Sequence, residues 1–298
     1  MPEYPDIVIY IERLQHFCAG QRLQHIQIAH PFLLRTAEPP VNVLEAQILQ
    51  GFERLGKRIV FIFSEDYFLI LHLMINGRLR WYGDNQKVPA KGWLARLLFD
   101  NGSLIINETS SQKRASLHLV KGKEALRDYD RGGLEVMTAT VEEFSAAIKA
   151  ENHTLKRALT DPRILSGIGN AYSDEILHRA RLSPTLLTQH LTGEQIAQLA
   201  NATREVLGEW TERLRAEAGE GFLDKVIAFR KEMAVHGRYG QSCPVCGTAV
   251  QRIRYATNET NYCPRCQTGG KLLADRSLSQ LLKKDWPRTI EELEERKH

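Results

Sequence analysis

The spacing of apolar side chains predicts a helical start followed by a strand-rich segment. Apolar residues recur every three or four positions between Ile7 and Cys18, which predicts an amphipathic helix with Cys18 on its buried side. From Gln21 to Glu108 the pattern changes to short apolar runs separated by tight turns. Two hairpins are clear, one around the turn 64–66 and one around the turn 100–102. Several short strands joined by tight turns indicate a β-sandwich or a barrel.

Helical spacing returns in the second half of the chain. A weakly patterned stretch around Gly132-Gly133 is interpreted as a hinge. Beyond it, helices are predicted over 141–150, 154–159, 171–180 and 193–217. The fold class is therefore α+β, with an N-terminal β-sandwich and a C-terminal helical domain. The expected divisions are a sandwich domain over 1–128, a hinge over 129–139, a helical domain over 140–236, a cysteine-containing finger over 237–267 and a C-terminal extension over 268–298.

Length and composition indicate how many domains the chain forms and where in the cell it is located. The chain has 298 residues, enough for about two domains, and its 43% hydrophobic and 26% charged content is ordinary for a globular protein. No apolar run approaches the roughly 20 residues that span a bilayer, and no basic flank precedes an apolar signal core. These features predict an intracellular, cytoplasmic protein. The net charge is only +4, but residues 237–284 contain eight Lys or Arg against two Asp or Glu, which favours a nucleic-acid surface there.

The cysteine pattern predicts a metal site. Cys243 and Cys246 form one C-x₂-C pair, and after sixteen residues Cys263 and Cys266 form a second. This spacing is typical of one structural Zn²⁺ held by four thiolates, which leave no coordination position for catalysis. Disulfide or redox use is the alternative, and an intracellular location argues against it.

The first residues offer a nucleophile. The small residue at position 2 permits removal of Met1, which would expose the Pro2 nitrogen next to the Glu3 carboxyl group. An α-amino group titrates near pH ~8, so part of it is unprotonated and nucleophilic at neutral pH. A secondary amine that attacks a sugar carbon gives a cationic iminium, which promotes elimination, and Glu3 could protonate the ring oxygen. The alternative is an ordinary helix start, where proline is common.

Two basic turns in the strand-rich part are candidate phosphate contacts. Lys57 lies between two strand-like runs, and Arg114 ends the basic turn 112–114. Taken alone, such turns are usually solvated surface, which is the alternative for both residues.

Two further candidates lie in the second half. Gly167 and Gly169 permit a tight turn before Asn170, where a helix begins, and Lys156 lies one element earlier. Exposed amides at a helix start bind phosphate well, although a plain helix cap has the same sequence. Between the cysteine pairs, Arg252 and Arg254 alternate with apolar residues, which predicts a basic hairpin that either contacts DNA or is a structural clip.

Taken together, these motifs resemble the formamidopyrimidine-DNA glycosylase/endonuclease VIII family over about residues 1–267. The resemblance rests on Pro2-Glu3 with Pro5 and Asp6, Arg54-x-Gly-Lys57, Gly-x-Gly-Asn170 with Glu175, and the four-cysteine finger, in this order. It implies a monomeric, zinc-containing enzyme of base excision repair, nucleoid-associated if bacterial, with a helix-two-turn-helix in its helical domain and damaged DNA between its lobes. It further implies glycosylase and abasic-site lyase activities on a flipped-out, oxidised base.

The resemblance also implies residue roles. Pro2 attacks the sugar, Glu3 is the acid and base, and Lys57 positions a phosphate at the active site. Asn170 and Lys156 hold the phosphates beside the lesion.

The sequence departs from the family pattern in four places. The segment 219–236 is shorter than the lesion-capping loop region of the family's oxidised-purine enzymes, so their base preference does not carry over. Asn258 stands where the family's finger commonly carries an arginine, a loss that Arg252 or Arg254 would have to offset. No phenylalanine occurs in the loop 112–115 that would fill the void left by the flipped base, so Met74 or Ile75 is the candidate wedge. A further departure is the extension after the finger, for which we expect a helix packing back on the protein, with a partner-binding role as the alternative. The missing arginine leaves a second function open, a catalytically reduced relative that binds damaged or branched DNA as a sensor.

Overall fold

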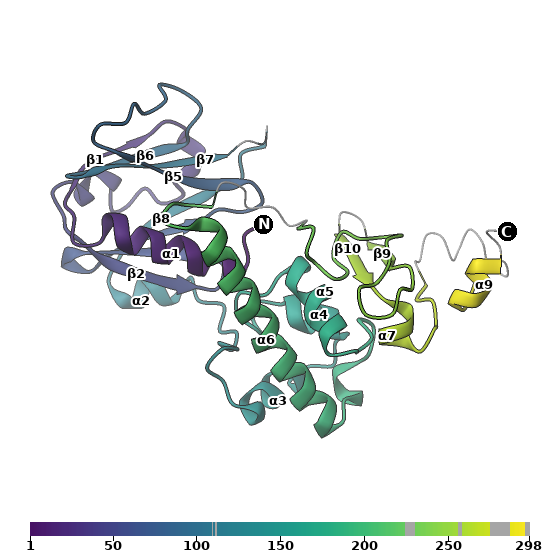
Figure 1. The fold of residues 1–298 in the computed structure, drawn as a ribbon. Coiled ribbons are helices and arrows are strands. Elements are labelled where there is room, and N and C mark those ends of the chain that lie inside the picture. Colours follow the sequence, from purple (N-terminus) through teal and green to yellow (C-terminus); the bar gives the residue numbers. More distant parts are fainter. Residues whose placement is uncertain (109, 111, 224–229, 256–257, 275–286, 296–298) are drawn as a thin grey trace. The chain divides into compact units, whose positions relative to one another are not determined.

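The computed structural model describes residues 1–108, 110, 112–223, 230–255, 258–274 and 287–295. The chain forms two compact units, which are described separately. The first unit comprises Met1–Arg131 and Glu209–Ile227, and the second comprises Gly132–Gly208 and Ala228–His298 (Figure 1).

The first unit contains two four-stranded antiparallel sheets among the described residues, with strand orders β1-β6-β7-β5 and β2-β3-β4-β8. This confirms the predicted sandwich and both predicted hairpins. The elements of this unit are the helices α1 (Tyr4–Cys18) and α2 (Lys123–Arg127), the strands β1 (Leu23–Ile28), β2 (Leu49–Leu55), β3 (Arg58–Phe63), β4 (Tyr67–His72), β5 (Gly77–Gly83), β6 (Ala95–Phe99), β7 (Gly102–Glu108) and β8 (Ser116–Lys121), and the short 3₁₀ helices η1 (Pro31–Leu33), η2 (Val41–Leu44) and η3 (Ser64–Asp66).

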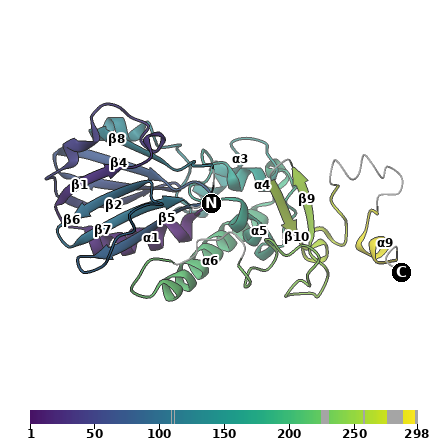
Figure 2. The same cartoon turned by 90° about the horizontal axis from the view of Figure 1, so that it is seen from above.

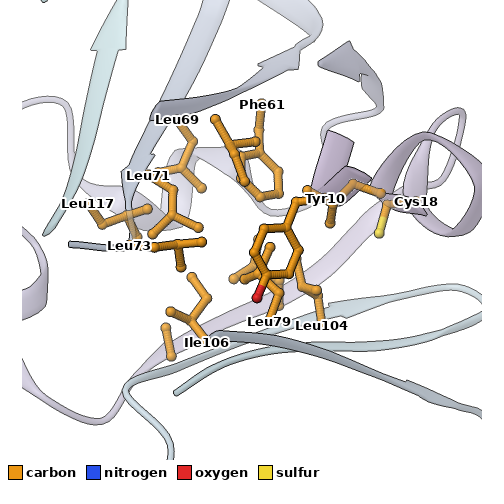
Figure 3. Close-up of a cluster of buried hydrophobic side chains, with 14 of the residues drawn as sticks. Tyr10, Cys18, Phe61, Leu69, Leu71, Leu73, Leu79, Leu104, Ile106 and Leu117 are labelled. Atoms are coloured by element: carbon orange, nitrogen blue, oxygen red, sulfur yellow. The ribbon is translucent and has the colours of Figure 1, made fainter. Parts of the chain in front are cut away.

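The core of this unit lies between its two sheets. Phe61 and Leu69 from one sheet belong to the same buried cluster as Leu104 and Ile106 from the other, and Tyr10 of α1 joins them (Figure 3). Alternate side chains of a strand point to opposite faces, which puts these residues on the inner faces of the sandwich. Cys18, at the end of α1, is fully buried in the same cluster, as predicted.

The end of a long helix belongs to the first unit. α6 (Gly193–Ala218) runs into the segment 209–227. Within that segment, Leu214 and Leu223 are buried in the sandwich core, and the Phe222 ring lies 5.9 Å from the Tyr10 ring, centroid to centroid. The helical domain was expected to keep all of 140–236, but this segment packs with the sandwich.

The second unit is mainly helical and contains a two-stranded hairpin followed, among the described residues, by two short helices. Thr140 caps α3 by accepting a hydrogen bond from the backbone N–H of Glu143. α5 contacts both α4 and the hairpin strand β10 (Figure 2). Besides the first part of α6, the elements are α3 (Val141–Lys149), α4 (Leu155–Thr160), α5 (Asn170–Arg179), η4 (Thr188–His190), β9 (Gln251–Tyr255), β10 (Asn258–Tyr262), α7 (Pro264–Thr268) and α9 (Ile290–Glu295).

The two described parts of the C-terminal extension pair with each other. The backbone N–H of Leu272 donates to the Arg288 carbonyl at 2.8 Å, and that of Ile290 donates to the Gly270 carbonyl at 3.0 Å. Ile290 is buried and begins α9. The extension contacts the finger where the backbone N–H of Leu273 donates to the Tyr262 hydroxyl of β10 at 2.8 Å, and a helix packing on the rest of the protein stays a prediction. The apolar positions Leu278, Leu281 and Leu282, on which that prediction rested, lie outside the described residues.

Candidate functional site

The first candidate site is the start of the chain, which is held against the sandwich. Pro2 is buried, and Glu3 is only 4% exposed immediately before α1. The backbone N–H of Glu3 donates to Oδ2 of Asp6 at 2.9 Å, so the first turn of α1 fixes the chain at residue 3. A nucleophile at position 2 would therefore be held rigidly, with one carboxyl group adjacent to it and a second one turn away.

Burial and nearby charges act together on the α-amino group at the chain start. Burial lowers the pKa of the Met1 amino group from its usual value near 8, and the positive charges of Arg78 and Lys57 lower it further. The carboxylates of Glu3 and Asp6 act in the opposite direction. The net result is a lowered pKa, which leaves a larger unprotonated, nucleophilic fraction at neutral pH than a free amino terminus has.

Lys57 lies in the turn between β2 and β3. Leu55 pairs with Arg58, which leaves Gly56 and Lys57 as the two turn residues, and Gly56 has a φ of 63°, which favours glycine. One side chain joins this turn to the start of α1. Arg54 Nη1 donates to the Gly56 carbonyl at 2.7 Å, while the Arg54 guanidinium lies 4.6 Å from the centre of the Tyr4 ring.

Strand register puts further candidates at the same end of the sandwich as Lys57. The β2–β3 turn, the last residue of β4 (His72) and the first residue of β8 (Ser116) all lie at one end of their sheet, since His72 pairs with Ser116. The connection 73–76 then leads from β4 into β5, whose first residue, Gly77, pairs with the last residue of β7, Glu108. Figure 2 shows the chain's N-terminus at this end of the sandwich.

His72 is half-buried at this end rather than a core residue. Burial, followed by the charges of Arg58 and Lys57, lowers the pKa of His72 to about 4. The imidazole is therefore neutral at pH 7, which makes it a hydrogen-bonding group beside Lys57 and not a third cation.

Two exposed side chains lie on connections at this end. Ile75 is 47% exposed and follows Met74, which has a φ of 53°. The Arg114 side chain is exposed. The backbone beside it is held by the buried Glu108 carboxylate, which accepts from the N–H groups of Arg114 at 2.9 Å and Ala115 at 3.1 Å. An apolar and a cationic side chain are thus available near the chain start.

The second candidate site lies in the second unit, around the start of α5. Gly167 has a φ of 83° in the turn that precedes the helix, as the glycine pattern predicts. The Asn170 side chain donates from Nδ2 to the Glu259 carbonyl of β10 at 2.9 Å, which joins the helix start to the hairpin. Lys156, Arg157, Asn170 and Ile253 line an open pocket next to it.

Lys156 is bound to protein atoms. Its ammonium group donates to the Asn170 carbonyl at 2.7 Å, to Ser173 Oγ at 2.7 Å and to Asp174 Oδ1 at 2.5 Å. An ammonium group has three donors, and these acceptors match that number. Lys156 therefore stabilises the first turn of α5, and a phosphate would bind it only by replacing one of these acceptors.

Asp174 connects this site to the finger. Its carboxylate is fully buried and accepts from His236 Nδ1 at 2.7 Å and from the backbone N–H of Asn261 at 3.1 Å, in addition to Lys156. A buried carboxylate needs such partners, because an uncompensated charge in the interior is costly. Asp174 therefore binds Lys156, His236 and β10 at one buried point.

The hairpin forms as predicted, with the two arginines on the same face. Arg252 Nη1 lies 3.2 Å and Arg254 Nε lies 3.3 Å from Oε2 of Glu259. The Arg252 guanidinium also lies 4.0 Å from the centre of the Tyr239 ring. Asn258 begins β10, and its side chain lies outside the described residues.

The four predicted ligands come together in the second unit. The sulfur atoms of Cys243, Cys246, Cys263 and Cys266 all lie within 4.8 Å of one another. Zn–S bonds of about 2.3 Å in a tetrahedron imply S···S separations of about 3.8 Å. The separations of 3.9 Å between Cys243 and Cys266 and of 3.4 Å between Cys246 and Cys263 fit that geometry. Four thiolates at this spacing fit one structural zinc ion.

Two residues of these sites could not be identified from the sequence. The charge of Arg78 acts on the chain start, and Asp174 holds the helix start. For Arg78 the sequence shows only that a basic residue follows Gly77. The contacts of Asp174, like those of Arg54 in the motif Arg54-x-Gly-Lys57, depend on tertiary packing.

The chain matches three protein domains along its length. Residues 1–114 match the formamidopyrimidine-DNA glycosylase N-terminal domain, residues 134–217 match the formamidopyrimidine-DNA glycosylase H2TH domain, and residues 240–269 match a zinc finger found in FPG and IleRS.

Individual proteins are similar to the chain over most of its length. A formamidopyrimidine-DNA glycosylase of Desulfitobacterium hafniense is 32% identical over 282 residues, covering 90% of this chain and all of that protein. An uncharacterized formamidopyrimidine-DNA glycosylase-like protein of Mycobacterium tuberculosis is 38% identical over 151 residues, 51% of this chain and 94% of that protein. The fold is similar to that of Lactococcus lactis Fpg in a complex with abasic-site DNA, with a TM-score of 0.79 at 24% identity over 89% of this chain and 99% of that one.

Proposed function

Because the chain belongs to the formamidopyrimidine-DNA glycosylase family of DNA glycosylases, we propose that it is a bifunctional enzyme of base excision repair. In this proposal it excises a damaged base, most simply an oxidised one, and then cleaves the strand by elimination. The observation that carries the proposal is the environment of the chain start. Pro2 and Glu3 are both buried at the chain start, next to the Asp6 carboxylate and within reach of the positive charges of Arg78 and Lys57.

The first step uses the Pro2 nitrogen exposed by removal of Met1. Its lone pair forms a bond to C1′ of the deoxyribose while the bond from C1′ to the damaged base breaks, and the base leaves with the bonding electrons and takes a proton from water. The Glu3 carboxylate takes the remaining N–H proton from the Pro2 nitrogen. Glu3 then gives a proton to the ring oxygen as the sugar ring opens, which produces a cationic iminium between Pro2 and C1′. The position of Glu3 supports this role, because its buried side chain follows Pro2 directly and is held before the first turn of α1.

The second step is an elimination, which the cationic iminium promotes because it makes the protons on C2′ acidic. Loss of a proton from C2′ drives departure of the 3′ phosphate, which breaks the strand. Lys57 and Arg78 lie close enough to lower the pKa of the chain's amino group, and in this proposal Lys57 holds the phosphate next to the reacting sugar.

The start of α5 supplies the second grip on DNA in this proposal. A helix start with an amide side chain suits a phosphate, and Arg157 lies beside it in the same pocket. Lys156 is assigned here as the residue that holds the helix start, and its direct contact with phosphate stays a prediction. Arg252 and Arg254 are proposed to contact the DNA backbone. To do so, their guanidinium groups would leave the Glu259 carboxylate and bind a phosphate.

Ile75 and Arg114 are proposed to occupy the space left by a flipped base. Their exposure supports this role, since an apolar wedge must stack between neighbouring bases. The exposed fraction of 47% favours Ile75 over Met74 as the wedge.

Borohydride trapping with abasic-site DNA tests the proposal. Processed protein, beginning at Pro2, is expected to give a covalent adduct whose mass equals the chain without Met1 plus the DNA fragment. The matched control is the same chain with Met1 retained, in which the Pro2 nitrogen is an amide. Absence of an adduct from processed protein that still binds abasic-site DNA would favour the damage-sensing alternative.

Replacing Asn170 with alanine is expected to weaken DNA binding by about tenfold, to the same extent for every sequence, because the contact is to the backbone. Fluorescence anisotropy with three unrelated duplexes measures this effect. Asn201→Ala, at an exposed position of α6, is the control. Unequal losses among the duplexes would show that Asn170 reads bases.

Cofactor, partners and location follow from the same proposal. One zinc ion is expected per chain, held by the four cysteines, and the partner is damaged DNA bound by a monomer in the cytoplasm or on the nucleoid. In the described parts of the chain, no helix has the length and apolar character to cross a membrane.

A further inference from the structure

The last turn of α5 reaches the cysteine cluster. His178, one residue before the end of α5, places Nε2 3.3 Å from Sγ of Cys243. Both side chains are buried, at 7% and 2% exposure. α5 also contacts β10 and α7 of the finger, so the histidine is held in place by packing along the whole helix.

The chemistry of the cluster fixes the direction of this contact. A metal-bound cysteine is a thiolate, which can accept a hydrogen bond but cannot donate one. The ring must therefore carry its proton on Nε2 and donate it to the sulfur. Four thiolates around one Zn²⁺ leave a net charge of −2, and an N–H donor directed at one of them offsets part of that charge.

We propose that His178 is a positioning residue of the metal centre, whose Nε2–H donates to the Cys243 thiolate, slows zinc release and makes that sulfur less nucleophilic. The same contact fastens the finger to the helix that carries Asn170 at its other end. This role does not depend on glycosylase activity, because it acts on metal retention.

Three variants of the full-length, zinc-loaded protein test this role. His178→Phe keeps an aromatic ring of similar size but removes the donor, and His178→Gln keeps an N–H donor on a side chain of similar reach. His190→Phe, at an exposed histidine in the same unit, is the matched control. Zinc transfer to a chromophoric chelator is expected to be about 10–100 times faster in His178→Phe, intermediate in His178→Gln and unchanged in His190→Phe.

Thiol labelling separates a hydrogen bond from general loosening of the finger. Alkylation followed by peptide mass spectrometry is expected to show Cys243 labelled several times faster in His178→Phe, with a smaller change at Cys266. Wild-type zinc release in His178→Phe would overturn the proposal. Equal acceleration of labelling at all four cysteines, with no recovery in His178→Gln, would also overturn it by showing that the histidine only fills space.

Discussion

Removal of the metal is expected to unfold the finger, to abolish DNA binding and to leave the sandwich folded. The apolar core of the finger is small, formed by Val235 and Val250 together with Cys243 and Cys263. Structural zinc contributes about 10–16 kcal/mol of binding free energy in zinc-finger peptides, and so few apolar side chains cannot replace it. Without the ion, deprotonated sulfurs within 4.8 Å of one another would repel.

Unfolding of the finger would also remove two contacts from the start of α5, where phosphate is proposed to bind. Asn170 loses the Glu259 carbonyl, and Asp174 loses the backbone N–H of Asn261. The sandwich has its own core between the two sheets, so it does not depend on the ion.

Hydrogen exchange after treatment with a chelator measures all of these effects. Loss of protection is expected in β9, β10 and α7, with protection retained in β3, β4 and β7. Binding of abasic-site DNA should fall to the background level and return when zinc is added back. The control is chelator with equimolar zinc, which removes no metal. Full affinity in metal-free protein would show that the finger is dispensable for binding.

Local patterns predicted what depends on neighbours in the sequence. The apolar spacing of α1, the two hairpins and the cysteine pairs each specify a structure within a few residues, and each formed as expected. Lys57 lies in the predicted turn because glycine precedes it at a φ of 63°.

Contacts between distant residues could not be predicted in this way. Asp174 meets Lys156, His236 and Asn261, which are far from it in sequence. The residues next to Asp174 in the sequence do not indicate which distant groups its carboxylate will bind. The sequence therefore indicated a phosphate-binding lysine, whereas the structure shows one whose donors bind protein atoms.

The end of α6 illustrates the same limit for domain boundaries. Its helical period continues through Gly208, where the first unit takes over from the second. Two contacts join the end of the helix to the sandwich. Leu214 packs in the sandwich core, and Arg215 forms an ion pair with Glu12, with 2.5 Å between Nη2 and Oε1. The helical period carries no information on which residues the helix packs against, so the sequence could not show that residues 209–227 pack with the sandwich.

Glu3→Gln is expected to lower the single-turnover rate of base excision by about 10²–10⁴-fold, because the amide cannot transfer a proton to the ring oxygen. Glutamine has nearly the same shape as glutamate, so the buried position before α1 should be kept. The backbone N–H of residue 3 can still donate to Asp6, as it does in the wild type. The change therefore tests chemistry separately from folding.

The adduct on abasic-site DNA should be much less affected than base excision. An abasic sugar exchanges in water with an open-chain aldehyde, which the Pro2 amine can attack without opening a ring or releasing a base. Glu53→Gln, at an exposed position of β2, is the matched control and should leave both rates unchanged. Quench-flow measurement on a lesion-containing duplex gives the excision rate, and borohydride trapping gives the adduct rate. An equal loss of both rates would place Glu3 in attack by the amine itself, whereas wild-type excision would remove it from the mechanism.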